Sequence, residues 1–149
     1  MPSPYHQTYG RILVTSATVT VTADAYLGTP IVLDRAAGIA VTLPAATGSG
    51  NEYQFIVATT FTGSATIAVA NATDVMQGTA TLFADAGDTV VGFATAASSD
   101  TITMTATNTT GGIAGCRIVL TDIKAGFWAV TMVSDAAGTE ATPFSATVS

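Results

Sequence analysis

Apolar and polar side chains alternate with a period of two residues along much of the chain. This period puts successive side chains on opposite faces of a strand, so that one face meets a core and the other meets solvent. Strands of this kind are typical of antiparallel sheets with one buried face. No segment carries a helical period, and the chain is therefore predicted to be all-β. The alternating runs span residues 17–22, 39–43, 53–57, 67–69, 101–107 and 127–132.

Turn-forming residues separate these runs at short intervals. Gly, Pro, Asp, Asn and Ser favour turns for different steric reasons, and they cluster between the alternating segments. Many short strands with frequent turns predict an antiparallel β-sandwich or a barrel-like domain. No repeat of fixed period is present, which disfavours a regular solenoid.

One stretch of the chain, residues 71–84, has no clear period. It is interpreted either as a wide loop or as a short helical turn that plugs the core with Val75, Met76 and Leu82. The two ends also differ from the middle. We expect an irregular N-terminal arm over residues 1–11, a single β domain over 12–140 and a C-terminal tail over 141–149.

Composition adds a constraint on the surface. The 149 residues include 28 Thr and 27 Ala, only 9% of them are charged, and the formal net charge is −6. Disorder is excluded because it needs low hydrophobicity and high charge, and four cations are too few to neutralise several nucleic-acid phosphates. Two explanations of the weak charge stay open: hydroxyl groups solvate the outside, or other subunits cover it.

The sequence contains few residues that are suited to catalysis. His6 is the single histidine, which makes a Ser-His-Asp or Cys-His arrangement improbable, and Cys116 lies in an apolar run that predicts a small buried side chain. Asp85 and Asp88 could be taken for a calcium loop, but the two acids with Gly between them fit a β-turn better. We therefore expect no enzyme, no cofactor and no metal; a glycosidase with two carboxylates is the weaker alternative.

Other recurrent features have plain structural explanations. Rows of Thr at 18, 20 and 22 and at 101, 103, 105 and 107 could form an ice-binding face, but without a repeat they fit the polar face of ordinary strands. The aromatic side chains at 53, 55, 127 and 128 fall in strand patterns, and most of them are predicted to be core. No run of about 18 strongly apolar residues suggests a membrane span, and the first residues do not form the pattern of a secretory signal.

Three segments resemble structural proteins of tailed bacteriophages. The first is a strand, a Leu-Pro pair, a Gly-x-Gly loop and an aromatic strand. The second is the stretch Asn-Ala-Thr-Asp-Val-Met-Gln-Gly, and the third is the Pro-Phe ending. In this sequence they occupy residues 33–57, 71–78 and 138–144. Within that group the chain is similar to small head-decoration, or cement, proteins.

The resemblance implies a β-rich protein, often a homotrimer, which binds the major capsid protein on the outer surface of the head and stabilises the lattice. It would be assembled in the cytoplasm of the host bacterium. No catalytic residue follows from it. The expected contacts with the capsid or with other subunits are Tyr5, His6, Tyr9 and Arg11 in the arm and Phe144 in the tail. The alternative is a receptor- or glycan-binding module of a tail fibre or tailspike.

Overall fold

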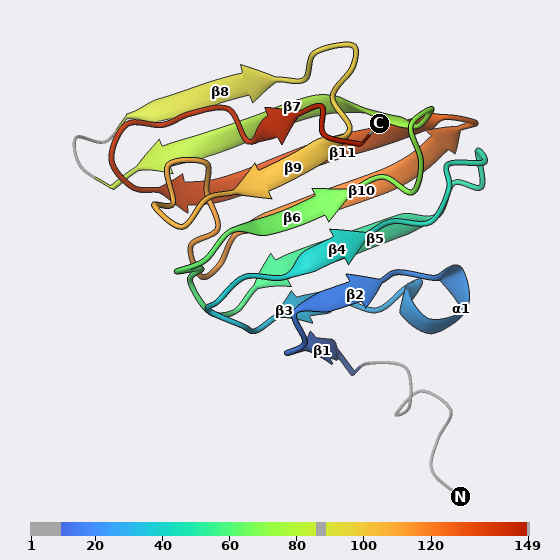
Figure 1. Ribbon diagram of the computed structural model, residues 1–149, viewed down its shortest axis with the longest axis horizontal. Helices are drawn as coiled ribbons and strands as arrows, with labels where there is room; N and C mark the ends of the chain where they lie inside the picture. The colour runs from blue at the N-terminus through green and yellow to red at the C-terminus, as the bar shows by residue number, and fades with distance from the viewer. Residues whose placement is uncertain (1–9, 86–88, 149) are drawn as a thin grey trace, which may run out of the picture.

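The computed structural model describes residues 10–85 and 89–148, which form two β-sheets packed face to face (Figure 1). We call the seven-stranded sheet at the back of Figure 1 sheet A. Its strands, in spatial order, are β1 (Ile12–Val14), β3 (Ile31–Leu33), β5 (Glu52–Val57), β10 (Arg117–Lys124), β11 (Phe127–Ala136), β7 (Val75–Ala84) and β8 (Val90–Ala94).

The front sheet, sheet B, has five strands. They follow the order β12 (Phe144–Ser145), β9 (Thr101–Met104), β6 (Ala65–Ala68), β4 (Ala40–Thr42) and β2 (Thr18–Thr20). One short helix, α1 (Ala23–Tyr26), connects β2 to β3. The all-β sandwich that the alternating pattern predicts is therefore confirmed.

The first six strands alternate between the two sheets, so the chain winds as an irregular coil. Strands β1, β3 and β5 pair in parallel in sheet A, and β2, β4 and β6 pair in parallel in sheet B. The turns of this coil have unequal lengths: Ile12 pairs with Ile31, and Ile31 pairs with Phe55. Unequal turns leave no periodic signal in a sequence, which is why repeat analysis does not detect the coil.

The sheets are mixed, so the prediction that the strands are antiparallel needs correction. Five of the ten strand pairings are parallel and five are antiparallel. The parallel pairings come from the coil and from the neighbours β7 and β11. A half-buried strand shows the same period of two in either orientation, because pleating is common to both.

Strand β7 corrects the interpretation of residues 71–84. The segment is neither a loop nor a helical turn from Val75 onward, but a ten-residue strand parallel to β11. Met76 and Leu82 are buried, as the plug interpretation required. Small residues hide the alternation, since the inward positions between them are Gly78 and Ala80.

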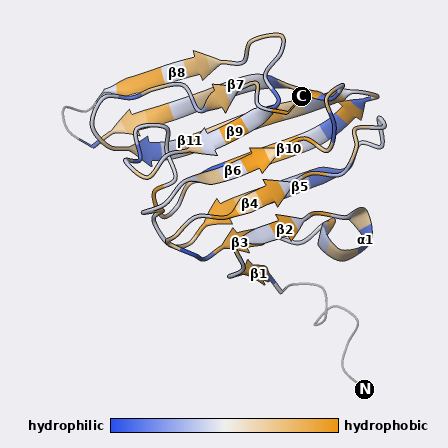
Figure 2. Ribbon diagram, in the orientation of Figure 1, coloured by the Kyte–Doolittle hydropathy of each residue, from blue (hydrophilic) through white to orange (hydrophobic). Residues whose placement is uncertain are grey.

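The core lies between the two sheets and consists of the inward positions of nearly every strand. Its largest members are Trp128 and Tyr53, whose ring centroids are 5.9 Å apart, together with Phe55 and Phe61. Burial of Tyr53, Phe55 and Trp128 confirms that these aromatics belong to the core. Cys116 is also buried, as predicted, and this burial raises the pKa of its thiol. In Figure 2 the most hydrophilic segments lie mainly in loops and at strand ends.

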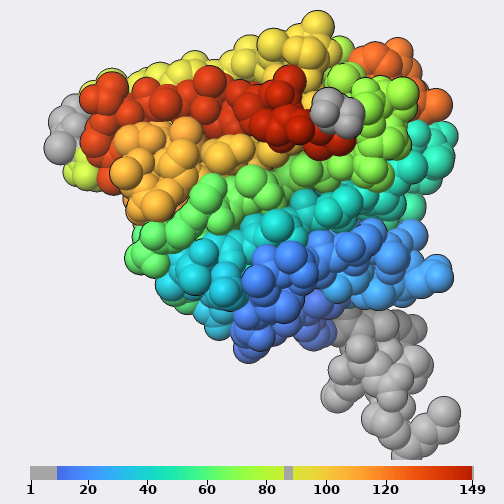
Figure 3. Space-filling view, viewed as in Figure 1, coloured from blue at the N-terminus to red at the C-terminus, as the bar shows by residue number. Residues whose placement is uncertain are grey.

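The C-terminal segment is part of the sandwich. Phe144 pairs with Ile102 as β12 joins the edge of sheet B, and its side chain is only 7% exposed. In Figure 3 this segment, coloured red, lies against the upper part of the domain. The expectation of Phe144 as an external contact therefore needs correction, because the ring already fills a place in the protein's own core.

Gly78 offers a test of the close approach between β7 and β11. A Cβ atom at this position would lie 1.8 Å from the carbonyl oxygen of Val130, and the residue has a φ of 155°. We expect Gly78→Ala to lower the free energy of unfolding by about 3 kcal/mol, because the two strands must separate. Chemical denaturation measures the change.

The matched control is Gly92→Ala on the neighbouring strand β8. No atom lies within 4 Å of a Cβ there, so this variant should unfold like the unmodified protein. Equal stability of the two variants would contradict the proposed close approach.

Candidate docking surface

The loop that carries the Leu-Pro and Gly-x-Gly residues is held by one buried carboxylate. Asp122, at the end of β10, accepts hydrogen bonds from the backbone N–H groups of Thr47 (3.0 Å), Gly48 (2.7 Å) and Ser49 (3.1 Å). The hydroxyl of Ser49 donates a fourth at 2.7 Å, and the hydroxyl of Thr47 a weaker fifth at 3.3 Å. Consecutive N–H groups that converge on one point form an anion-binding nest, and here the anion is internal.

The nest changes the acidity of this carboxylate. Burial on its own would raise the pKa of Asp122, but the donors from Thr47, Gly48 and Ser49 outweigh burial and lower the pKa from 3.8 to about 2. Hydrogen bonds to the ionised form stabilise that form. Asp122 is therefore an ionised clamp for the loop, and its oxygens are occupied within the chain.

Two further buried aspartates act in the same way. Asp74 accepts from the backbone N–H of Ala46 at 2.8 Å, at the start of the same loop. Asp100 accepts from the backbone N–H groups of Thr147 at 2.8 Å and Val148 at 3.2 Å, and so holds the C-terminal segment. Among the nine acidic side chains that the structure describes, three are thus internal, and the described surface carries even less charge than the composition indicates.

The outer face of sheet B, which we call the threonine face, carries only small side chains in its two rows. Register places Thr18, Ala40, Thr66 and Thr103 in one row, and Thr20, Thr42, Ala68, Thr101 and Ser145 in the other. Ala interrupts both rows, and the hydroxyl of Thr101 bonds to Asp100 and Thr147. The hydroxyls therefore do not form the continuous ranks that an ice-binding face needs.

The outer face of sheet A, which we call the apolar face, is different in kind. One row crosses all seven strands and brings together residues far apart in the sequence. Leu13 and Val133 in this row are each 44% exposed. The row consists of Leu13, Val32, Ile56, Arg117, Val133, Thr81 and Gly92. Contiguous exposed apolar side chains on a soluble domain mark interaction sites.

A second set of exposed apolar side chains lies at the corner of this face. Phe83 on β7 is 41% exposed and pairs with Val90 on β8, which is 55% exposed. On its other side Phe83 pairs with Asp135 of β11. A cavity of about 300 Å³ opens here, where the chain at Ala114 and Gly115 diverges from β11.

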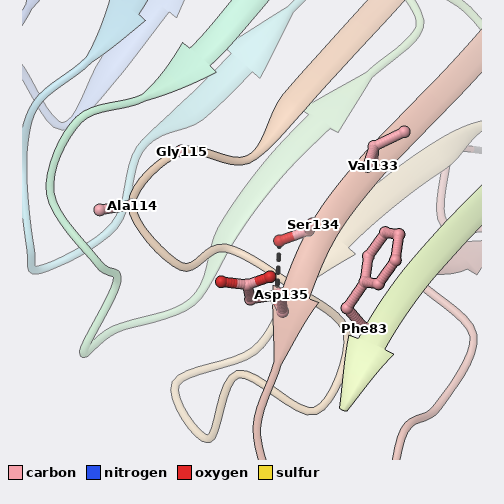
Figure 4. Close-up of a pocket in the computed structure, with 6 residues that line it drawn as sticks. All are labelled: Phe83, Ala114, Gly115, Val133, Ser134 and Asp135. Carbon is pink, nitrogen blue, oxygen red and sulfur yellow. Dashed lines mark hydrogen bonds between the residues drawn. The ribbon is translucent and has the colours of Figure 1, made fainter. Parts of the chain in front are cut away.

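Figure 4 shows how this cavity is built. The Asp135 carboxylate lies on the side of β11 that faces Ala114, and the Phe83 ring lies on the side of β7. The hydroxyl of Ser134 points inward and donates to the carbonyl oxygen of Asp135 at 2.8 Å. The cavity therefore combines an aromatic ring, small residues and one carboxylate, a combination suited to holding a protein side chain.

The structure describes only part of the predicted contact set. Tyr5, His6 and Tyr9 lie outside the described residues. Arg11 is exposed and lies two residues before Leu13, at the edge of the apolar face. Phe144 is buried, as noted above. The exposed side chains of the apolar face were missed, because a sequence pattern cannot distinguish a strand face that meets a core from one that meets solvent.

The metal hypothesis gains no support from the described part of the chain. Asp88 lies outside it, and Asp85 donates its backbone N–H to the carbonyl of Ala136. Among residues 10–85 and 89–148 no three His, Cys, Asp or Glu side chains are grouped so that they could hold a metal ion. Within the same ranges, no helix has the length and apolar character needed to cross a membrane.

Comparison of this chain with protein-family models, with curated proteins and with solved structures finds no match. Its function must therefore be argued from its own residues and surfaces.

Asp122→Asn tests the role of the loop clamp. Loss of the charge weakens several charge-assisted hydrogen bonds at once, and we expect a cost of about 2–4 kcal/mol in the free energy of unfolding. The dependence on pH provides a second readout. Because folding lowers the pKa of Asp122, its contribution is complete above pH 4 and is lost as the pH falls through about 2.

Urea denaturation at pH 7 and at several values between pH 2 and 4 measures both effects. The variant should lack the part of the acid sensitivity that Asp122 contributes. Glu52→Gln is a suitable control, since this exposed carboxylate accepts only a side-chain bond of 3.3 Å from Thr121. Identical acid profiles for the Asp122 variant and the unmodified protein would contradict the clamp.

Proposed function

We propose that this chain is a structural protein of a tailed-bacteriophage virion that binds the major capsid protein on the outside of the head. The observation that carries the proposal is the apolar face, where exposed and half-buried aliphatic side chains from four strands, β1, β3, β5 and β11, lie in one row with a single charge. Depletion of charge and exposure of apolar groups are typical of the centre of a protein interface. The partner is therefore a protein surface rather than a small substrate.

The segments that carry the resemblance have definite roles in the fold, which supports using it. Residues 33–57 form the coil turn from β3 through β4 to β5, and the loop within it is held by Asp122. Residues 71–78 include a turn in which the side chain of Asn71 accepts from the backbone of Thr73 and Asp74, before β7 begins. The likeness thus concerns residues that shape the domain.

We assign capsid binding to the half of the apolar face that lies on β1, β3 and β5. Leu13, Val32 and Ile56 are adjacent there, and Arg11 stands next to them at the edge of the sheet. The predicted arm leads directly into this half. Each copy needs only a weak contact, because many copies or linked contacts on a lattice raise the overall avidity by ~10²–10⁴.

A tail-fibre module that binds glycans is supported less well. Sugar binding uses exposed aromatic faces, whereas Trp128, Tyr53 and Phe55 are all buried. Among the described aromatic residues only Phe83 is exposed, and one ring between Val90 and Asp135 is not the set of exposed aromatic faces that sugar binding uses.

Cosedimentation with heads assembled from the major capsid protein of the same phage tests the proposal. We expect the unmodified chain to bind and Leu13→Asp to bind about tenfold more weakly or worse, because a buried carboxylate would lack a partner. Thr42→Asp on the threonine face is the matched control and should bind normally. Deletion of residues 2–10 measures the contribution of the arm.

Absence of binding by the unmodified chain, or equal binding by the Leu13 and Thr42 variants, would overturn the proposal. The number of copies in each virion gives an independent check. Decoration requires hundreds of copies on a head, whereas a tail fibre requires few.

A further inference from the structure

We infer that a second copy of this chain binds to the corner patch of the apolar face, in a two-fold arrangement. The corner patch consists of Phe83, Val90, Arg117, Val133 and Asp135. This inference does not rest on capsid binding, which we assign to the opposite half of the face.

The patch is continuous across four neighbouring strands. Val133 pairs with Arg117 on one side, and Phe83 pairs with Asp135 and with Val90. Three of the six large hydrophobic side chains that are exposed in the described chain are in this patch: Phe83, Val90 and Val133. An exposed aromatic ring beside aliphatic groups is typical of the energetic centre of an interface.

The patch also carries one positive and one negative side chain. Arg117 and Asp135 are both exposed, and neither forms an ion pair or a side-chain hydrogen bond within the residues that the structure describes. They lie on either side of Val133: Arg117 is its neighbour on β10, and Asp135 is two residues further along β11.

This arrangement of charge is complementary to itself. A two-fold interface uses the same patch on both subunits, so a contact from residue i to residue j is repeated from j to i. The two-fold axis lies in the plane of the interface. A rotation that brings Arg117 opposite Asp135 of the second copy also brings Asp135 opposite Arg117 of that copy. Val133 is one strand spacing, about 4.8 Å, from Arg117. It is two residues, about 6.6 Å, from Asp135, so the two separations are similar. The two Val133 side chains therefore meet near the axis.

Phe83 extends the contact in the same arrangement. It lies one strand beyond Asp135, on the side away from β10. The rotation that places Asp135 of the second copy opposite Arg117 therefore places Phe83 of that copy two residues from Arg117 along β10, over the half-buried side chain of Val119. Each ring would then pack on Val119 of the other copy.

A charge-swap experiment tests this contact specifically. Sedimentation velocity of the full chain over a range of concentrations, at low salt, should reveal a dimer. The single variants Arg117→Glu and Asp135→Arg each place like charges opposite each other, and we expect each to weaken the dimer roughly tenfold or more. The double variant restores both ion pairs and should return the dimer to nearly its original strength.

Matched controls are Lys124→Glu and Glu52→Arg, which reverse exposed charges elsewhere in sheet A and should leave the dimer unchanged. Circular dichroism establishes that all variants are folded. Phe83→Ala provides a further variant that leaves the charges intact, and it should also weaken the dimer.

A monomer at every concentration overturns the inference, as does a trimer, which a two-fold contact cannot form. Single reversals that behave like the controls, or a double variant that is not rescued, overturn it too. A monomer whose binding to capsids is reduced by the same reversals would instead assign the corner patch to the capsid protein. Failure of capsid binding with an intact dimer would leave this inference standing.

Discussion

Satisfying buried backbone groups where the chain crosses between the two sheets is the constraint on which the rest of this structure depends. A segment that connects a strand of one sheet to a strand of the other lies outside both hydrogen-bonding ladders. Its backbone N–H groups must therefore find other acceptors. Asp122, Asp74 and Asp100 supply those partners from inside the protein. Two of them hold the loop before β5, and the third holds the C-terminal segment against sheet B.

These internal carboxylates affect the surface as well as the interior. Because these three acidic side chains are buried, the surface carries fewer charges than the composition indicates. The two outer faces then divide the remaining chemistry. The threonine face offers hydroxyls and methyl groups to solvent, whereas the apolar face exposes Leu13, Phe83, Val90 and Val133. Only the apolar face has the character of a surface that another protein covers.

Two separate uses of the apolar face are consistent with a protein that works in many copies. One half, near β1, continues into the N-terminal segment. The other half, toward β8, carries Arg117 and Asp135, on which we base the proposed contact with a second copy. A binding surface for a lattice and a self-association surface on the same sheet would couple attachment to assembly, since each bound pair has twice the number of lattice contacts.

The sequence by itself determined the all-β class, and its alternating runs gave the positions and the buried sides of six of the twelve described strands: β2, β4, β5, β6, β9 and β11. The runs around Val41, Phe55, Ile102 and Trp128 were sufficient, because a period of two follows directly from the pleat. The sequence also predicted correctly the burial of Cys116 and of Tyr53, Phe55 and Trp128, whereas Phe127 is half-buried on the outer side of β11. It did not predict β7, since Gly78 and Ala80 are too small to mark the inward face.

The tertiary structure decided which strands are neighbours, and with that everything on the surface. Parallel pairing, the coil of the first six strands and the row from Leu13 to Thr81 depend on contacts between residues far apart in the chain. Phe144 shows most clearly what a sequence pattern cannot determine. Its ring is buried because the segment pairs with the edge of sheet B, and nothing in the local sequence specifies that pairing. A local pattern records that a side chain alternates, but only packing determines whether its face meets a core, solvent or another protein.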